Sequence, residues 1–104
     1  MSIPTASLTT LSAYQAEARR TINQKLTDDQ RLLDAAAGLA EEAGEVLAHV
    51  RKHLLQGRQL DRDSLTLELG DALWCVAITA DTLGIALEDV ARRNVDKLRA
   101  RHPP

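Results

Sequence analysis

The chain has 104 residues, 44% hydrophobic and 27% charged, which predicts one globular domain over 1–104. Its formal net charge of −2 and its scattered basic residues form no basic surface, so we expect no nucleic-acid partner. The single Cys75 excludes an internal disulfide, the N-terminal segment lacks the features of a signal peptide, and no apolar run approaches the roughly 18 residues of a membrane span, so we expect a cytoplasmic protein with no membrane partner.

The first predicted helix covers about residues 7–24. Apolar residues recur there at three- and four-residue steps from Leu8 to Leu26, the spacing of one helical face. Gln15 lies in the middle of this stripe, where its amide needs a partner. It either binds a substrate base or bonds a neighbouring main-chain group.

Two longer helices follow. Thr27 opens a sequence of the capping-box type, and the apolar stripe behind it continues to Gly57, which ends the second helix. Asp61 or Asp63 is suited to cap the third helix, and Gly84 to terminate it. No segment alternates with the period of a strand, so the predicted fold class is all-α, with four helices in a bundle.

The third predicted helix has two apolar faces. At about 100° per residue, Leu67, Trp74 and Ile78 lie opposite the main apolar stripe. A helix that is apolar on opposite sides must be covered on both, and the chain has little material to do so. We therefore expect self-association with Trp74 as an interface anchor; the alternative is that Trp74 packs inside its own subunit.

Two pairs of acids point to a metal site. Glu42 and Glu45 lie along one edge of the second helix's apolar stripe, and Glu68 and Asp71 lie along the edge of the third helix's stripe. If the two helices are antiparallel neighbours, all four carboxylates can face one point, where they repel unless a cation lies between them. Oxygen ligands favour magnesium, and manganese also fits. The alternative is a charged helix surface.

Two histidines on the same side of the second helix, His49 and His53, raise the alternative of a mixed nitrogen and oxygen site. Di-iron bundles use Glu-x-x-His, and the step from Glu45 to His49 is one residue longer. We therefore expect neither histidine to bind metal.

The fourth predicted helix begins near Leu87 and stops at Pro103. Asn94 lies in the middle of its apolar stripe, and Lys97 and Arg101 extend the same side. An amide and two cations near a metal cluster are suited to gripping a polyphosphate. The alternative is a basic helix end favoured by the helix dipole, which accounts for the cations but not for the amide.

Three motifs together resemble the MazG-like all-α nucleoside triphosphate pyrophosphohydrolases: EEAGE, ELGD after a linker, and NVDKLRARHP. The resemblance runs from about Gly38 to Pro103. It implies a magnesium-dependent hydrolysis of nucleoside triphosphates to monophosphate and pyrophosphate, in which the four acids bind the metal and the fourth helix holds the phosphates. Glu41 is implied as the general base. Obligate dimers or tetramers are implied as well.

Two other functions fit some of these features. A carboxylate metal-binding bundle with a redox or storage role would bind iron or manganese tightly without a nucleotide. A noncatalytic helical interaction module would be expected to have lost one or more of the acids, and this chain has lost none.

Overall fold

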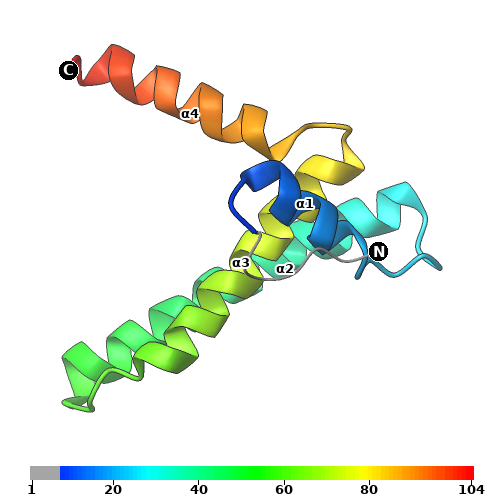
Figure 1. Ribbon diagram of the computed structural model, residues 1–104. Coiled ribbons are helices and arrows are strands. Elements are labelled where there is room, and N and C mark those ends of the chain that lie inside the picture. The colour runs from blue at the N-terminus through cyan, green and yellow to red at the C-terminus, as the bar shows by residue number, and fades with distance from the viewer. Residues whose placement is uncertain (1–7) are drawn as a thin grey trace.

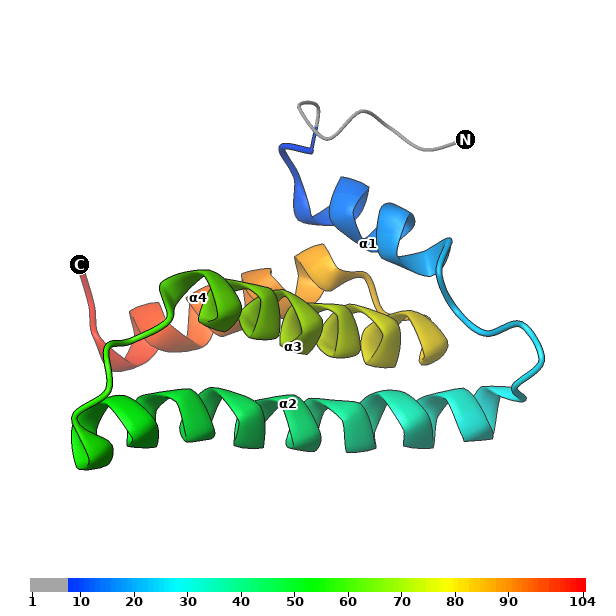
Figure 2. The same ribbon diagram turned by 90° about the horizontal axis from the view of Figure 1, so that it is seen from below.

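The computed structural model describes residues 8–104, which form four helices and no strand: α1 (Leu11–Arg19), α2 (Asp28–Gln56), α3 (Arg62–Thr82) and α4 (Leu87–Arg101). The predicted all-α class is confirmed for this part of the chain. α2 and α3 form a long antiparallel hairpin, α1 packs near the end of the hairpin at which α3 finishes, and α4 diverges from the same end (Figures 1 and 2).

α1 is several residues shorter than its apolar stripe predicts, and the predicted start at Ser7 lies outside the described residues. The Thr10 side chain caps the helix at its start. Beyond its end, the Thr21 hydroxyl donates to the Ala18 carbonyl at 2.8 Å, and the Asn23 side chain accepts from the Lys25 amide at 3.0 Å. Such local bonds favour turns over continued helix.

The ends of α2 and α3 agree with the sequence signals. Thr27 forms a complete capping box, and Gly57 ends α2 with a left-handed φ of 66°. Of the two aspartates suited to cap α3, Asp61 accepts from the Ser64 amide at 3.1 Å. Gly84 follows α3 with a φ of 72°, a conformation that glycine adopts without steric cost.

The buried core is small and centres on α3, with side chains from α1, from the first half of α2 and from the first residue of α4. Its members are mostly alanines, with two larger side chains: Ala18, Ala35, Ala77, Ile78 and Leu87. Trp74 packs against this core, and its indole N–H donates to the Thr21 hydroxyl at 2.8 Å. These contacts support the alternative that Trp74 packs inside its own subunit, because the indole holds the segment after α1 against α3. Trp74 is only partly buried, and its role as an interface anchor stays a prediction.

α4 extends away from the other helices, and most of its surface is uncovered. The direction of the chain changes by 105° between α3 and α4, and among the described residues α4 contacts α1 and α3 but not α2. Every residue of α4 from Arg92 onward is exposed. A single chain thus does not close the predicted bundle, and its radius of gyration of 16.0 Å exceeds the roughly 13 Å of a compact chain of this length.

No single helix among residues 8–104 is both long enough and apolar enough to cross a membrane. α3 and α4 meet those two requirements only when taken together as a bent pair.

Candidate metal centre

A close approach of α2 and α3 brings the acids together. A Cβ added to Gly38 would lie 3.0 Å from the sulfur of Cys75, so only a glycine lets the two helices lie this close without a shift. Glu42 follows Gly38 by four residues, and Asp71 precedes Cys75 by four. Because the helices are antiparallel, one turn along each from this contact places these two acids opposite each other.

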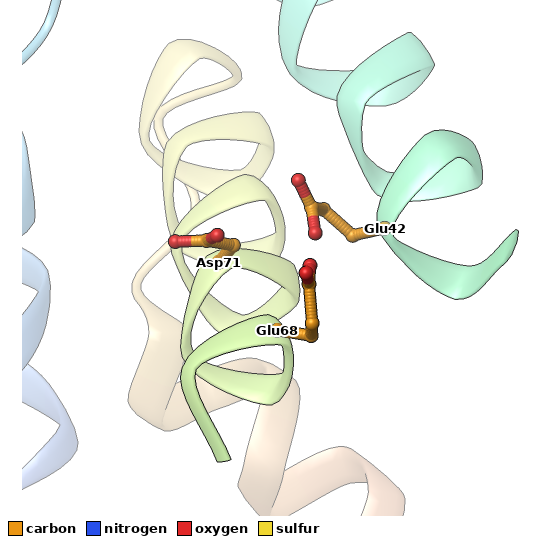
Figure 3. A group of neighbouring side chains, drawn as sticks. All are labelled: Glu42, Glu68 and Asp71. Atoms are coloured by element: carbon orange, nitrogen blue, oxygen red, sulfur yellow. The ribbon is translucent and has the colours of Figure 1, made fainter. Parts of the chain in front are cut away.

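Three carboxylates cluster where α2 and α3 lie side by side: Figure 3 shows Glu42 and Glu68 between the helices and Asp71 on the exposed side of α3. Glu42 from α2, and Glu68 and Asp71 from α3, each bring one carboxylate oxygen within 4.8 Å of the others (Figure 3). Within residues 8–104 no lysine or arginine forms an ion pair with any of them. A cluster of oxygen donors without a cationic side chain is suited to a hard divalent ion such as magnesium or manganese.

The electrostatics of Glu42 reflect this crowding. Its hydrogen bond with the Glu68 carboxyl, its burial, and the charges of Glu68, Asp71 and Glu41 together raise the pKa of Glu42 to about 7. One of its oxygens, Oε2, is buried and has no hydrogen-bond partner. A carboxyl group with an orphaned oxygen beside two further acids is the arrangement expected where a cation completes the site.

The other two acids of the EEAGE motif lie outside the cluster. Glu45 is exposed on the next turn of α2 and is not one of the carboxylates that converge. Glu41 is also exposed, and its charge contributes to the raised pKa of Glu42. The structure therefore brings together three of the four predicted metal ligands and leaves the predicted general base at the edge of the site.

Two neighbours of the cluster escaped the sequence analysis. Burial, followed by the charges of Asp71 and Cys75, raises the pKa of Tyr14 on α1. Burial, followed by the nearby acids, raises the pKa of the Cys75 thiol. Tyr14 is three residues after Leu11 on the apolar side of α1, which was the available signal that it would face the hairpin.

The histidines of α2 lie outside the cluster of acids. His53 contacts the Arg58 carbonyl through its Nδ1 at 2.8 Å and so helps to close the turn after α2. Neither it nor His49 belongs to the converging group.

The predicted phosphate grip lies on the free part of α4. Asn94, Lys97 and Arg101 are all exposed. Because α4 does not contact α2, the structure does not join this grip to Glu42 within one chain. Asn94 is exposed rather than buried in its apolar stripe, since Val95 and Leu98 beside it are themselves 41% and 48% exposed.

Gln15 is buried, and main-chain groups occupy both ends of its amide. Its Nε2 donates to the carbonyl of Ile85 at 3.0 Å, and its Oε1 accepts from the amide of Leu87 at 2.9 Å. The structure thus places Gln15 in the second of its two predicted roles. A substrate could contact this amide only by replacing one of these bonds.

Comparison with known proteins finds similarity over most of the chain. Residues 30–104 match the MazG nucleotide pyrophosphohydrolase domain. The Gene 37 protein of Mycobacterium phage L5 is 43% identical over 68 residues, which are 62% of this chain and 60% of the phage protein. The Bacillus subtilis (strain 168) protein YvdC, described as uncharacterized, is 35% identical over 72 residues, or 61% of this chain and 68% of YvdC. No solved structure matches the chain.

Proposed function

Because the chain belongs to the family of MazG nucleotide pyrophosphohydrolase domains, we propose that it hydrolyses (deoxy)nucleoside triphosphates between the α- and β-phosphates. The products are a nucleoside monophosphate and pyrophosphate. The convergence of Glu42, Glu68 and Asp71 is the observation that carries this proposal. A role in clearing unwanted nucleotides from the cellular pool is part of the proposal, with residues 1–104 acting as one cytoplasmic domain.

Magnesium is the proposed cofactor, with manganese as a substitute. Glu42, Glu68 and Asp71 would hold it, and Glu45 would join them by reorienting its exposed side chain. When bound, the ion neutralises charge on the phosphate oxygens and lowers the pKa of water. The raised pKa of Glu42 means that this carboxyl gives up a proton when a cation takes its place in the cluster.

The remaining chemistry falls to side chains around the acids. Glu41 lies next to Glu42 in the chain and projects about 100° away from it, so it would accept a proton from the attacking water without binding the metal. Asn94, Lys97 and Arg101 would hold the triphosphate through charge-assisted hydrogen bonds. We do not assign the base a partner, because both ends of the Gln15 amide are engaged.

A homodimer or homotetramer is the proposed assembly. The accessible surface of the chain is 7889 Å², whereas a compact monomer of this mass exposes about 5,800 Å². Several leucines of the hairpin are more than half exposed: Leu33, Leu47, Leu54, Leu55, Leu67 and Leu69. A second copy that fills the open angle between the hairpin and α4 would cover such side chains and bring a phosphate grip to the acids.

The assembly is tested by charging the uncovered side of α4. Leu98→Asp places a carboxylate in the stripe, and Ala100→Asp places one on the opposite side of the same helix as a control. In sedimentation across a concentration series, the first variant should dissociate and the second should behave as the wild type. A wild-type protein that is monomeric and active would contradict the proposed assembly.

The activity is tested with a panel of nucleoside triphosphates and magnesium, by measuring pyrophosphate and orthophosphate separately. Glu42→Gln and Glu68→Gln should abolish pyrophosphate release while the helical content is unchanged, because removing a charge from a repelling cluster does not harm folding. Asp29→Asn, an exposed acid at the start of α2, should have no effect. Tight iron binding without turnover of any nucleotide would favour the redox or storage bundle instead.

A further inference from the structure

Gln15 joins α1 to the start of α4. Its side chain is 5% exposed. Besides the bonds to Ile85 and Leu87, its Nε2 lies 3.5 Å from the carbonyl of Ala77 on α3. One amide therefore connects α1, α3, the α3–α4 turn and the first residue of α4.

α4 has no N-cap of its own. The residue at its N-cap position is Ala86, and no side chain of that position caps the helix. The first amides of a helix need partners from outside the helix. Gln15 supplies one of them from α1 by accepting from the Leu87 amide. A serine or aspartate at position 86 would instead bond the amide of Glu88 or Asp89, so it could stabilise the first turn of α4 but could not replace the link to α1.

Little else fixes the direction of α4. Leu87 is buried, but the helix is exposed from Arg92 to its end. The other side-chain bond between α1 and α4 is an exposed one, from the Ser12 hydroxyl to Glu88 at 3.1 Å. Figure 1 shows α4 extending away from the other helices. Its direction is thus decided at its first turn.

A small tilt of α4 at its first turn displaces the residues of the phosphate grip by a larger distance. At about 1.5 Å per residue, Lys97 lies roughly 15 Å and Arg101 roughly 21 Å along the axis from Leu87. A tilt of about 10° would move these two positions by roughly 2.5 and 3.5 Å. A misplacement of about 1 Å can lower a rate by about two orders of magnitude.

We propose that Gln15 is a positioning residue, which holds α4 at the angle at which its phosphate grip meets the triphosphate. It acts through Leu87 and Ile85 and does not touch the substrate. The inference rests on the proposed function for its kinetic consequence. Gln15 lies outside residues 30–104, the part that matches the family domain. The residue that positions α4 therefore comes from the N-terminal segment of this chain.

The test separates positioning from helix capping. Gln15→Met keeps the length of the side chain and removes both kinds of hydrogen bond. Adding Ala86→Asp to it gives α4 an N-cap of its own, which restores stability to the helix but does not reconnect α4 to α1. Ala86→Asp alone is the matched control. The double variant also keeps the test open if Gln15→Met by itself does not fold.

Two readouts are needed, one of them independent of activity. Double electron–electron resonance between spin labels at positions 29 and 99 reports the distance from α2 to α4. The protein is free of nucleotide and is diluted with unlabelled chain, so that the distance within one chain is measured. We expect a broader distribution in Gln15→Met and in the double variant, but not in Ala86→Asp. In kinetics, KM for the triphosphate should rise at least tenfold in both Gln15→Met variants, while Mn²⁺ affinity stays within twofold.

Unchanged distances in the Gln15→Met variants would overturn the inference whatever the activity. So would a wild-type KM in the double variant, because it would show that Gln15 only caps the helix. If the distances broaden but the wild type turns over no nucleotide, the positioning of α4 stands and the proposed function fails.

Discussion

Gly38→Ala probes the contact that aligns the two acidic helices. The new Cβ would lie 3.0 Å from the buried Cys75 sulfur, and overpacking of this kind costs about 1–3 kcal/mol. Replacing glycine by alanine within a helix stabilises the helix by about 1 kcal/mol. The net decrease in the free energy of unfolding should therefore be up to about 2 kcal/mol. If α2 and α3 move apart, Mn²⁺ affinity should fall about three- to tenfold, which corresponds to about 0.7–1.4 kcal/mol.

Gly44→Ala is the matched control, because a Cβ at that position of α2 meets nothing within 4 Å. It should gain the roughly 1 kcal/mol of helix propensity and leave Mn²⁺ binding unchanged. Removing the thiol as well, in Gly38→Ala/Cys75→Ala, should make the double variant about 1–3 kcal/mol more stable than the two single effects predict. Urea unfolding at one protein concentration and Mn²⁺ titration measure both quantities. A Gly38→Ala variant that behaves like Gly44→Ala would refute the close approach.

Three further outcomes follow from the site and the core. The pKa of Glu42 in the folded state, about 7, exceeds the ordinary value of 4.5, so the folded state binds more protons than the unfolded state between these pH values. Metal-free stability should therefore fall as pH rises from 4.5 through about 7, while Mg²⁺ affinity should rise. Urea unfolding and titration calorimetry at several pH values check both signs. Lys97→Ala should raise KM for triphosphates about tenfold or more. Arg92→Ala, which removes a cation paired on α4, should leave KM unchanged; equal effects of the two variants would show that Lys97 does not hold the phosphates. Trp74→Phe should lower the free energy of unfolding by about 1 kcal/mol, because the bond to Thr21 is lost, and should leave the sedimentation coefficient unchanged. Dissociation of the oligomer in this variant would show instead that Trp74 anchors an interface.

The helices were readable from the sequence because their signals are local. Thr27, Gly57, Asp61 and Gly84 mark helix ends through bonds and φ angles that involve only neighbouring residues. The end of α1 was missed because turn-forming bonds of Thr21 and others compete with an apolar stripe that continues beyond them.

The tertiary arrangement was harder to predict because periodicity gives the face of a helix and not its partner. Trp74 and Ile78 of the predicted second face pack within the chain, near α1 and the segment after it, whereas Leu67 on the same face is exposed. The convergence of Glu42, Glu68 and Asp71 was predictable from two spaced acid pairs on antiparallel helices, whereas the position of Glu45 depends on the exact register of the pair. The bonds of Gln15 depend on the α3–α4 turn, which no local pattern specifies.

Isotope-labelled water tests the central claim most directly. The protein is incubated with magnesium and a nucleoside triphosphate that it turns over, in ¹⁸O-enriched water, and the products are separated and weighed by mass spectrometry. Attack on the α-phosphate predicts one ¹⁸O atom in the nucleoside monophosphate, none in the pyrophosphate, and no product in the Glu42→Gln variant. A labelled pyrophosphate, or a nucleoside diphosphate with orthophosphate as the products, would contradict it.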